Sequence, residues 1–208
     1  MNDRNELIMT VKVLAYNDNV YGENKVRHMQ LETKDGKRFN GEHWNPDESI
    51  INKDIKYTII GKIKQNEYEK DGKRIKTYVI NIENLETVDM NGKEINSVIL
   101  QGRITKLETK NINNRILNEL VIANNYYVKK ESEIEGYEQR TNWFNVNVWG
   151  EMNSEINIGK RIILEGKYEQ DNWEYEGKQY SKYKITAQEI HLIKEERNEY
   201  RRKDGVER

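Results

Sequence analysis

The sequence lacks several features that would place it in a common class of protein. None of its 208 residues is cysteine, which excludes disulfide bonds and thiolate-bound metal sites. No long apolar run follows the polar residues 1–6, so we expect neither a signal peptide nor a membrane span. The formal net charge is −1, which does not by itself indicate a polyanionic partner. These absences favour a cytoplasmic protein without a membrane partner.

Catalytic sequence patterns are also absent. The chain contains no His-Glu-x-x-His, Gly-x-Ser-x-Gly, phosphate-loop or dinucleotide-binding fingerprint. Among its three histidines, His43 has the inward parity of its strand, as a core or rim residue would. The many carboxylates alternate with lysines, as they do on solvated surfaces. We therefore predict no catalytic residue, no cofactor and no metal site, with a barrel nuclease that uses scattered carboxylates as a lesser alternative.

What the chain does contain is an internal repeat. Residues 39–88 align with residues 144–193 without a gap, at a constant offset of 105, and fourteen of the fifty positions are identical. A repeat of this period indicates duplicated domains, because solenoid units are about 20 to 50 residues long. The chain has room for two domains of about 100 residues. We place them at residues 1–92 and 93–193, followed by a charged, flexible tail at residues 194–208.

Each repeat contains five segments rich in β-branched and aromatic residues, which are typical of strands. They are residues 7–15, 26–33, 38–44, 55–65 and 75–88 in the first repeat, and residues 98–107, 116–124, 141–149, 161–170 and 180–193 in the second. Residues 46–51 and 151–158 can each form a short helix between the third and fourth strands. This order predicts an all-β protein of two tandem OB-folds, which are five-stranded Greek-key barrels. Another five- or six-stranded barrel or sandwich is the alternative.

The repeats differ in the connection between the second and third strands. It spans residues 34–37 in the first repeat and residues 125–140 in the second, where Lys129, Lys130 and Arg140 lie among tyrosines and glutamates. Long loops without secondary structure are often functional, so we predict that this loop contributes to a binding site. The alternative is a solvated hairpin.

The third strand of the second repeat predicts a surface of exposed rings. Side chains on a strand point alternately to opposite faces. The apolar residues of this strand form the core side, and the opposite face carries Trp143, Asn145, Asn147 and Trp149. Unpaired nucleotides suit such a surface, because each base stacked on an aromatic ring contributes roughly 1 to 3 kcal/mol without demanding a sequence.

The first repeat has a related face. Trp44 occupies the position of Trp149, and Arg38 occupies that of Trp143. A guanidinium can also stack on a base or pair with a phosphate. The hairpin between the fourth and fifth strands adds one ring among lysines in each repeat, Tyr68 in the first and Trp173 in the second.

We therefore predict a nucleic-acid-binding surface of rings, amides and cations. Its rings are Trp44, Tyr68, Trp143, Trp149 and Trp173, and its amides are Asn145 and Asn147. Its cations are Arg38, Lys62, Lys73, Arg103, Lys129, Lys130, Arg140, Lys167 and Lys178. In the alternative explanation, the hairpin lysines are balanced by neighbouring glutamates and the tryptophans are covered at a subunit contact.

Several motifs of the second repeat occur together: residues 96–105, 119–123, 141–144, 148–151 and 159–166, and Trp173 before Gly177. In this combination they resemble the bacterial and phage single-stranded DNA-binding protein family. The resemblance implies an OB-fold that binds single-stranded DNA by stacking on Trp143, Trp149 and Trp173. Because family members commonly assemble four OB-folds, it also implies a homodimer or higher homo-oligomer. It does not extend to the acidic tail of many members, since residues 201–208 read RRKDGVER.

The sequence therefore predicts a non-catalytic protein that coats and protects single-stranded DNA. We expect it to act in replication, recombination or transfer of a phage, plasmid or bacterial genome. Single-stranded RNA is an alternative ligand, because stacking does not depend on the sugar. A protein-binding adaptor, whose rings are interface residues, is the other alternative.

Overall fold

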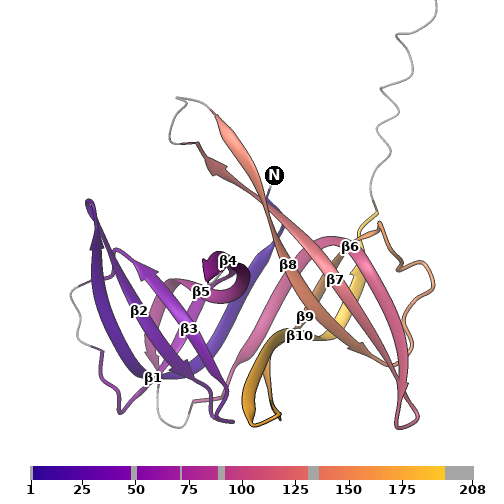
Figure 1. Cartoon of the computed structure of the whole chain (residues 1–208), viewed down its shortest axis with the longest axis horizontal. Coiled ribbons are helices and arrows are strands. Elements are labelled where there is room, and N and C mark those ends of the chain that lie inside the picture. The colour runs from indigo at the N-terminus through magenta and orange to yellow at the C-terminus, as the bar shows by residue number, and fades with distance from the viewer. Residues whose placement is uncertain (1, 48–50, 71, 89–91, 131–135, 195–208) are drawn as a thin grey trace, which may run out of the picture.

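A computed structural model describes residues 2–47, 51–70, 72–88, 92–130 and 136–194. These residues form ten strands and no helix, so none of them forms a helix that could span a membrane (Figure 1). The strands of the first half are β1 (Asn5–Tyr21), β2 (Asn24–Glu32), β3 (Arg38–Trp44), β4 (Lys56–Lys70) and β5 (Lys73–Val88). Those of the second half are β6 (Asn96–Ile112), β7 (Arg115–Lys129), β8 (Tyr137–Trp149), β9 (Arg161–Tyr175) and β10 (Lys178–Leu192). The all-β prediction is confirmed, and each predicted strand corresponds to one of the ten.

The strands of each half pair in a closed ring. In the first half, β1 pairs with β2 and β4, β2 with β3, and β4 with β5, and a short parallel pairing of β3 with β5 closes the ring. The second half repeats these pairings with β6 to β10. Alternate side chains fill each interior, including Leu31 and Ile59 in the first ring and Ile122 and Leu164 in the second. The period-two pattern of the sequence therefore sorts core from surface in both halves.

Each ring contains a glycine where two strands approach closely. Gly61 on β4 and Gly166 on β9 occupy equivalent positions of the repeat. A Cβ added to Gly61 would lie 2.2 Å from the carbonyl oxygen of Asn81, and one added to Gly166 would lie 2.4 Å from that of Thr186. Both sites adjoin a β-bulge between the paired strands. Glycine is required here because any side chain would collide with the neighbouring backbone.

The two rings are joined by antiparallel pairing of β1 with β6, from Asn5 opposite Leu100 to Met9 opposite Asn96. At its centre, Leu7 lies opposite Val98. These two residues are equivalent, since Leu7 pairs with Gly61 and Val98 pairs with Gly166. The junction is therefore two-fold within one chain, like the contact of a symmetric dimer. It makes a continuous six-stranded sheet in the order β5-β4-β1-β6-β9-β10.

At each end of this junction, an asparagine bonds to the neighbouring strand of its own half. The Asn5 side chain donates to the carbonyl oxygen of Ile63 (2.7 Å) and accepts from its backbone N–H (3.2 Å). The Asn96 side chain makes the same two contacts with the backbone of Tyr168, at 2.9 and 3.0 Å. Each asparagine thus completes hydrogen bonds that the sheet leaves open at its edge.

The predicted helix at residues 151–158 is wrong. This segment forms two turns, in which the Asn153 side chain accepts from the N–H of Glu155 (2.9 Å) and the Asn157 side chain from that of Ile158 (2.7 Å). Such local bonds compete with helical bonding, which explains the difference. The other predicted helix, at residues 46–51, lies partly outside the described residues, and the predicted tail at residues 194–208 lies outside them except for residue 194.

The prediction of a long loop at residues 125–140 is also wrong. Strands β7 and β8 continue into this segment, with pairing out to Lys129 opposite Tyr137, and form a projecting arm (Figure 1). This segment is rich in polar and aromatic residues, but backbone hydrogen bonds between the two strands hold it as a hairpin whatever its side chains are. Residues 125–129 and 137–140 are therefore a hairpin, and their contribution to a binding site stays a prediction.

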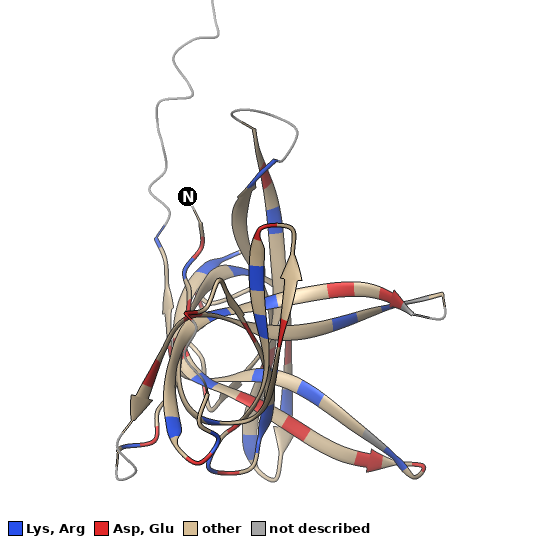
Figure 2. Ribbon diagram, turned by 90° about the vertical axis from the view of Figure 1, so that its left-hand side faces the viewer, with Lys and Arg blue, Asp and Glu red and all other residues tan. Residues whose placement is uncertain are grey.

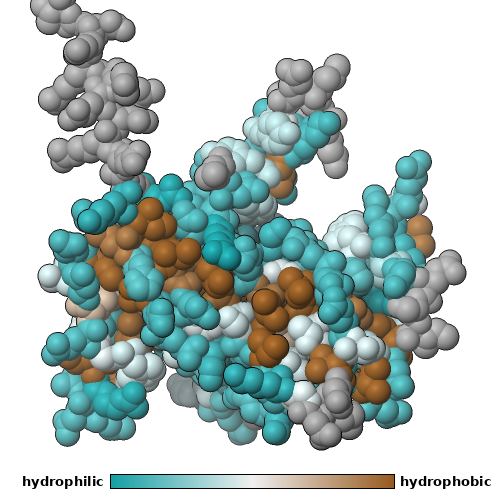
Figure 3. Space-filling view, turned by 180° about the vertical axis from the view of Figure 1, so that it is seen from behind, coloured by the Kyte–Doolittle hydropathy of each residue, from teal (hydrophilic) through white to brown (hydrophobic). Residues whose placement is uncertain are grey.

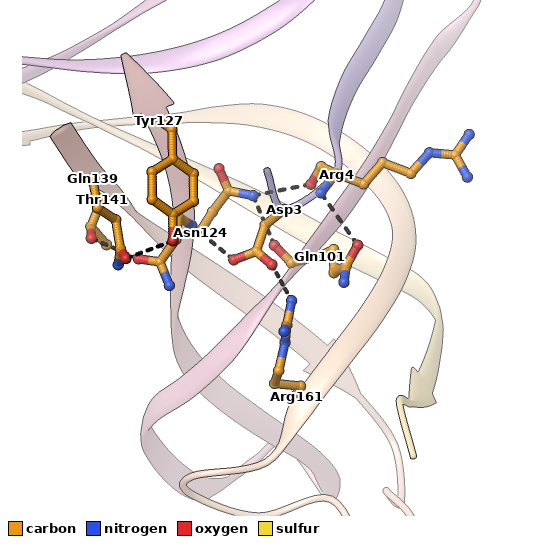
Figure 4. Close-up of polar contacts among 9 residues, drawn as sticks. Asp3, Arg4, Gln101, Asn124, Tyr127, Gln139, Thr141 and Arg161 are labelled. Atoms are coloured by element: carbon orange, nitrogen blue, oxygen red, sulfur yellow. Dashed lines mark hydrogen bonds and ion pairs between the residues drawn. The ribbon is translucent and has the colours of Figure 1, made fainter. Parts of the chain in front are cut away.

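The segment before β1 is held by the second half of the chain (Figure 4). The backbone N–H of Asp3 donates to the carbonyl oxygen of Asn125 (2.8 Å), and the Asp3 carboxylate accepts from the N–H of Asn125 (2.8 Å). The same carboxylate, whose side chain is 5% exposed, forms an ion pair with Arg161 on β9. The carbonyl oxygen of Arg4 accepts from the Asn124 side chain (3.0 Å). This segment therefore bridges β7 and β9.

We expect Asp3→Ala to lower the free energy of unfolding by about 1 to 3 kcal/mol, because it leaves buried hydrogen-bonding groups without a partner. The measurement is urea unfolding followed by circular dichroism. Glu6→Ala is the matched control, since the Arg4–Glu6 ion pair (2.8 Å) is exposed on both sides and should contribute about 0 to 1 kcal/mol. Equal losses from the two substitutions would contradict this role of Asp3.

Candidate nucleic-acid interface

Strand β8 separates a core face from an outer face. Three apolar side chains fill the ring interior: Phe144, Val146 and Val148. On the other face, Trp143 and Trp149 are 39% and 38% exposed. Asn145 and Asn147 lie between them on that face and are half-buried. The predicted alternation is therefore observed: two amides lie between two indoles on the outer face.

Strand β3 shows the same division in the first half. Phe39 is buried, while Arg38 and Trp44 lie on the outer face, with Trp44 45% exposed. The Arg38 guanidinium pairs with Glu32 at 3.2 Å, and its side chain is well exposed. An exposed pair of this kind contributes about 0 to 1 kcal/mol, so an anionic ligand can replace the glutamate.

The tryptophan that ends each of these strands contacts a hairpin of its own half. The Arg115 guanidinium, at the start of β7, lies 4.8 Å from the centre of the Trp149 ring. The Tyr21 ring, at the end of β1, lies 6.5 Å from the Trp44 ring. A cation or ring against an indole limits its movement and leaves the exposed part available to a further flat group.

The β4–β5 and β9–β10 hairpins project toward the same side of the molecule (Figure 2). Trp173, 45% exposed, lies directly opposite Tyr180 across the β9–β10 hairpin. Their rings are stacked, with centres 5.8 Å apart and planes 16° apart. In the β4–β5 hairpin the exposed ring is Tyr68, opposite Ile75. Each hairpin therefore carries an exposed ring near its end.

Comparison with known proteins agrees with this arrangement in the second half. The model of the single-strand binding protein family matches residues 95–193, which include β8 and the β9–β10 hairpin. This part of the chain is therefore similar to the single-strand binding protein family. The match does not extend to residues 1–94.

Two curated relatives match about half of the chain. A single-stranded DNA-binding protein of Treponema pallidum (strain Nichols) is 26% identical over 107 residues, covering 48% of this chain and 58% of the relative. A protein of the same name from Aquifex aeolicus (strain VF5) is 28% identical over 105 residues, covering 48% of this chain and 70% of the relative. The chain thus spans a little over half the length of the first of these relatives.

A solved structure resembles nearly the whole chain. The wild-type single-stranded DNA binding protein from Thermus aquaticus matches with a TM-score of 0.72 and 15% identity, covering 94% of this chain and 96% of that one. A deletion mutant of the same protein matches with a TM-score of 0.70. At this identity the similarity shows the fold alone, and it extends over both halves.

The predicted cations are spread over several elements. Lys62, Arg103 and Lys167 lie on β4, β6 and β9, strands that do not pair with β3 or β8. Lys129, Lys130 and Arg140 lie on the arm of β7 and β8, and Lys178 starts β10 near the end of its hairpin. Arg38 is on β3 itself, and the side chain of Lys73 lies outside the described residues. The structure therefore does not bring these cations together at the two Trp-bearing strands.

Several of these cations have acidic or carbonyl partners. Lys62 forms an ion pair with Glu83, Arg140 pairs with Glu138 (3.4 Å), and Arg103 donates to the carbonyl oxygen of Gly159. Lys and Arg alternate with Asp and Glu along both projecting hairpins (Figure 2). The hairpins are therefore mixed in charge, as the net charge of −1 suggests.

The sequence prediction missed Arg115, Tyr21 and Tyr180. Tyr21 lies on β1 and Arg115 on β7. The β1–β2 and β6–β7 hairpins are repeats of each other at an offset of 91 residues, because Leu7 is equivalent to Val98. Few identities mark that offset, so the repeat at offset 105 did not reveal it. Tyr180 was detectable in principle, because hairpin register places it opposite Trp173.

Within the described ranges, no group of three or more His, Asp or Glu side chains could hold a metal ion. His43 is half-buried on β3, and burial lowers its pKa below the ordinary value. Its rim position agrees with the sequence prediction.

An ion pair supports the β1–β2 hairpin, in which Val26 lies opposite Trp44 of β3. The buried Arg27 guanidinium donates to both carboxylate oxygens of Asp18, at 2.8 and 3.0 Å, and lies 5.0 Å from the centre of the Tyr16 ring. Lys25 pairs with the same carboxylate at 3.1 Å. The hydrogen bond from Arg27 lowers the pKa of Asp18 from 3.8 to about 2.

This pKa predicts acid sensitivity. Asp18 binds a proton less readily in the folded chain than in the unfolded chain, so its contribution to stability is present above about pH 4 and is lost as the pH falls toward about 2. We expect urea unfolding to show that wild type has a higher free energy of unfolding than Asp18→Asn, and that this difference narrows as the pH falls from about 4 to about 2. Asp54→Asn, at an exposed turn, is the control for removing one charge. A gap that stays constant from pH 6 to pH 2 would contradict the assignment.

Proposed function

We propose that this protein binds single-stranded DNA without sequence preference, by stacking bases on uncovered indoles and contacting phosphates with lysine and arginine. One observation carries the proposal. The chain has four tryptophans, and all of them are 38% to 45% exposed on β3, β8 or the β9–β10 hairpin. A folded protein ordinarily buries its indoles, so leaving all four in contact with solvent indicates a ligand for their faces.

The chemistry of the surface fits unpaired nucleotides. A base stacked on an indole contributes roughly 1 to 3 kcal/mol, and every base presents a flat face. Asn145 and Asn147 lie between two rings, where amides can bond to base edges or phosphates. The Arg115 guanidinium beside Trp149 and the Tyr180 ring beside Trp173 hold these indoles in orientations suited to stacking.

The relatives support the same ligand. The matched curated proteins are named single-stranded DNA-binding proteins, and the match includes β8 with Trp143 and Trp149. We propose that the two rings are tandem OB-folds, at residues 1–92 and 93–193, and that the protein has no catalytic role. It would coat single strands exposed during replication, recombination or DNA transfer. Its site comprises the predicted rings and amides, together with Arg115, Tyr21 and Tyr180. Its proposed cations are Arg38, Lys73, Lys129, Lys130, Arg140 and Lys178, since Lys62, Arg103 and Lys167 lie on the six-stranded sheet.

Oligothymidine titration tests this proposal. Intrinsic tryptophan fluorescence of the wild-type protein should be strongly quenched when bases stack on the indoles. Affinity, measured by the anisotropy of a labelled oligothymidine, should fall about five- to 150-fold for Trp143→Ala and for Trp149→Ala, corresponding to the loss of one stacked base. The circular dichroism spectrum should stay unchanged.

Ile158→Ala is the control, since this exposed side chain lies on neither β3 nor β8 and should leave affinity unchanged. Wild-type affinity in both tryptophan variants would refute the surface. An absence of quenching would favour a protein-binding adaptor instead. Competition with a matched oligouridine at fixed salt tests whether RNA is the preferred ligand.

We also propose that two copies of the chain assemble through the six-stranded sheet. Its outer face exposes the adjacent pair Ile8 and Ile60, 39% and 38% exposed, and carries the half-buried Ile99 and Ile163. Seen from behind, the molecule shows apolar patches among polar side chains (Figure 3). Uncovered apolar patches of this kind mark protein contacts, and the two-fold symmetry of the sheet suits a second copy.

Light scattering coupled to size-exclusion chromatography tests the assembly. Wild-type protein should elute with the mass of a dimer, and the double variant Ile8→Asp, Ile99→Asp should elute as a monomer, because burying two carboxylates opposes association. Ile158→Asp changes an equally apolar exposed residue elsewhere and should leave the dimer intact. A monomeric wild type, or a dimer unaffected by the double substitution, would refute this interface.

A further inference from the structure

The β4–β5 hairpin of the first half is hydrogen-bonded to β8 of the second. The Tyr78 hydroxyl donates to the carbonyl oxygen of Trp143 (2.6 Å), and the backbone N–H of Trp143 donates to the Gln65 side chain (3.3 Å). The N–H of Gln65 in turn donates to the Asn142 side chain (3.0 Å). Both main-chain groups of a proposed stacking residue are therefore held by the other half of the chain.

The opposite pair of elements makes the same contact. The Tyr183 hydroxyl on β10 donates to the carbonyl oxygen of Arg38 (3.3 Å), and the N–H of Arg38 donates to the Gln170 side chain (3.0 Å). Arg38 is the repeat equivalent of Trp143. The β9–β10 hairpin of the second half thus holds β3 of the first half just as the β4–β5 hairpin holds β8.

The repeat shows which part of this contact is kept. Gln65 matches Gln170 and Tyr78 matches Tyr183, whereas the residues that they hold, Arg38 and Trp143, differ. This pattern follows from the chemistry, because the glutamine and tyrosine bind only the backbone groups of the held residue. The side chain at the held position can therefore change without losing the contact.

The held backbone has no strand partner on that side. β8 pairs with β10 only from Val146 to Val148, and β3 pairs with β5 only from Gly41 to His43. Before these short parallel pairings begin, the same strand edge has open N–H and C=O groups at Trp143 and at Arg38. Unpaired backbone groups at a strand edge require other partners, and the glutamine and tyrosine of the opposite half supply them.

The two tyrosine rings are packed as well as hydrogen-bonded. Tyr78 stacks on Phe144, with ring centres 6.1 Å apart, and Tyr183 lies 5.7 Å from Phe39. The two tyrosines meet edge to face at 6.2 Å. Burial raises the pKa of both phenols, so both hydroxyls remain protonated donors at neutral pH. Removing a hydroxyl while keeping the ring therefore isolates the hydrogen bond from the packing.

We propose that Tyr78 and Gln65 are positioning residues for Trp143, and that Tyr183 and Gln170 are positioning residues for Arg38, each acting across the boundary between the two halves. The proposal rests on the proposed function, because it concerns how the stacking surface is held. A base gains most from a ring that is already fixed, since ordering a mobile strand edge on binding subtracts from affinity. The two halves thereby hold Trp143 and Arg38 in one fixed relation.

A double-mutant cycle tests the proposal, with the anisotropy of a labelled oligothymidine as the readout. Tyr78→Phe should weaken binding about three- to tenfold in the wild-type background, the usual effect of one hydrogen bond. It should have almost no further effect in the Trp143→Ala background, because the ring that it positions is already gone. Gln65→Met, which removes the acceptor for the Trp143 N–H at similar size, should show the same dependence on Trp143.

Tyr183→Phe is the matched control. It removes the equivalent hydroxyl but acts on Arg38, so it should weaken oligothymidine binding by the same factor with Trp143 present or replaced. If Tyr78→Phe acts only on the structure, it should weaken binding equally in both backgrounds, and that result overturns the proposal. Unchanged affinity in both Tyr78→Phe and Gln65→Met also overturns it. Urea unfolding of each variant confirms that a folded protein is being compared. Wild-type protein that fails to bind oligothymidine overturns the proposed function itself, before any variant is measured.

Discussion

The antiparallel pairing of β1 with β6 determines how the rest of the molecule is arranged. It joins two closed rings at equivalent residues, Leu7 and Val98, so that the chain acquires a two-fold relation between its halves. Because each ring pairs its strands in the same order, this single junction also decides which elements meet across the boundary. It brings the β4–β5 hairpin to β8 and the β9–β10 hairpin to β3. A different register between β1 and β6 would separate these contacts, since a one-residue slip exchanges the two faces of a strand.

The four tryptophan side chains can remain exposed because the core does not need them for its packing. Aliphatic side chains and two phenylalanines fill the ring interiors, and tyrosines pack where the halves meet. Three of the exposed tryptophans contact a neighbouring side chain: Trp44 contacts Tyr21, Trp149 contacts Arg115 and Trp173 contacts Tyr180. For Trp143 the support is on the backbone instead. Rigid, partly supported rings are suited to binding flat groups with little loss of conformational entropy.

Strand positions and core faces were predictable from the sequence, whereas contacts between distant segments were not. The alternation of Phe144, Val146 and Val148 with Trp143 and Trp149 follows from strand geometry alone, and the burial of the first three side chains confirms it. The helix predicted at residues 151–158 failed because Asn153 and Asn157 bond to their own backbone. The loop predicted at residues 125–140 failed because its polar composition hides cross-strand pairing. Gln65 and Tyr78 were visible only as repeat identities, since their partner at Trp143 lies 65 to 78 positions away and nothing local indicates it.

The segment before β1 has a consequence for how the chain folds during its synthesis. Asp3 and Arg4 leave the ribosome well before their partners Asn124, Asn125 and Arg161, which lie 120 to 158 positions later. The β1–β5 ring contains all of its own pairings and can close before the second half has emerged. Residues 3 and 4 then remain solvated until β7 and β9 have been synthesised and can bind them. Completion of the second ring and anchoring of the segment before β1 are therefore one late event, delayed by the long loop that it closes.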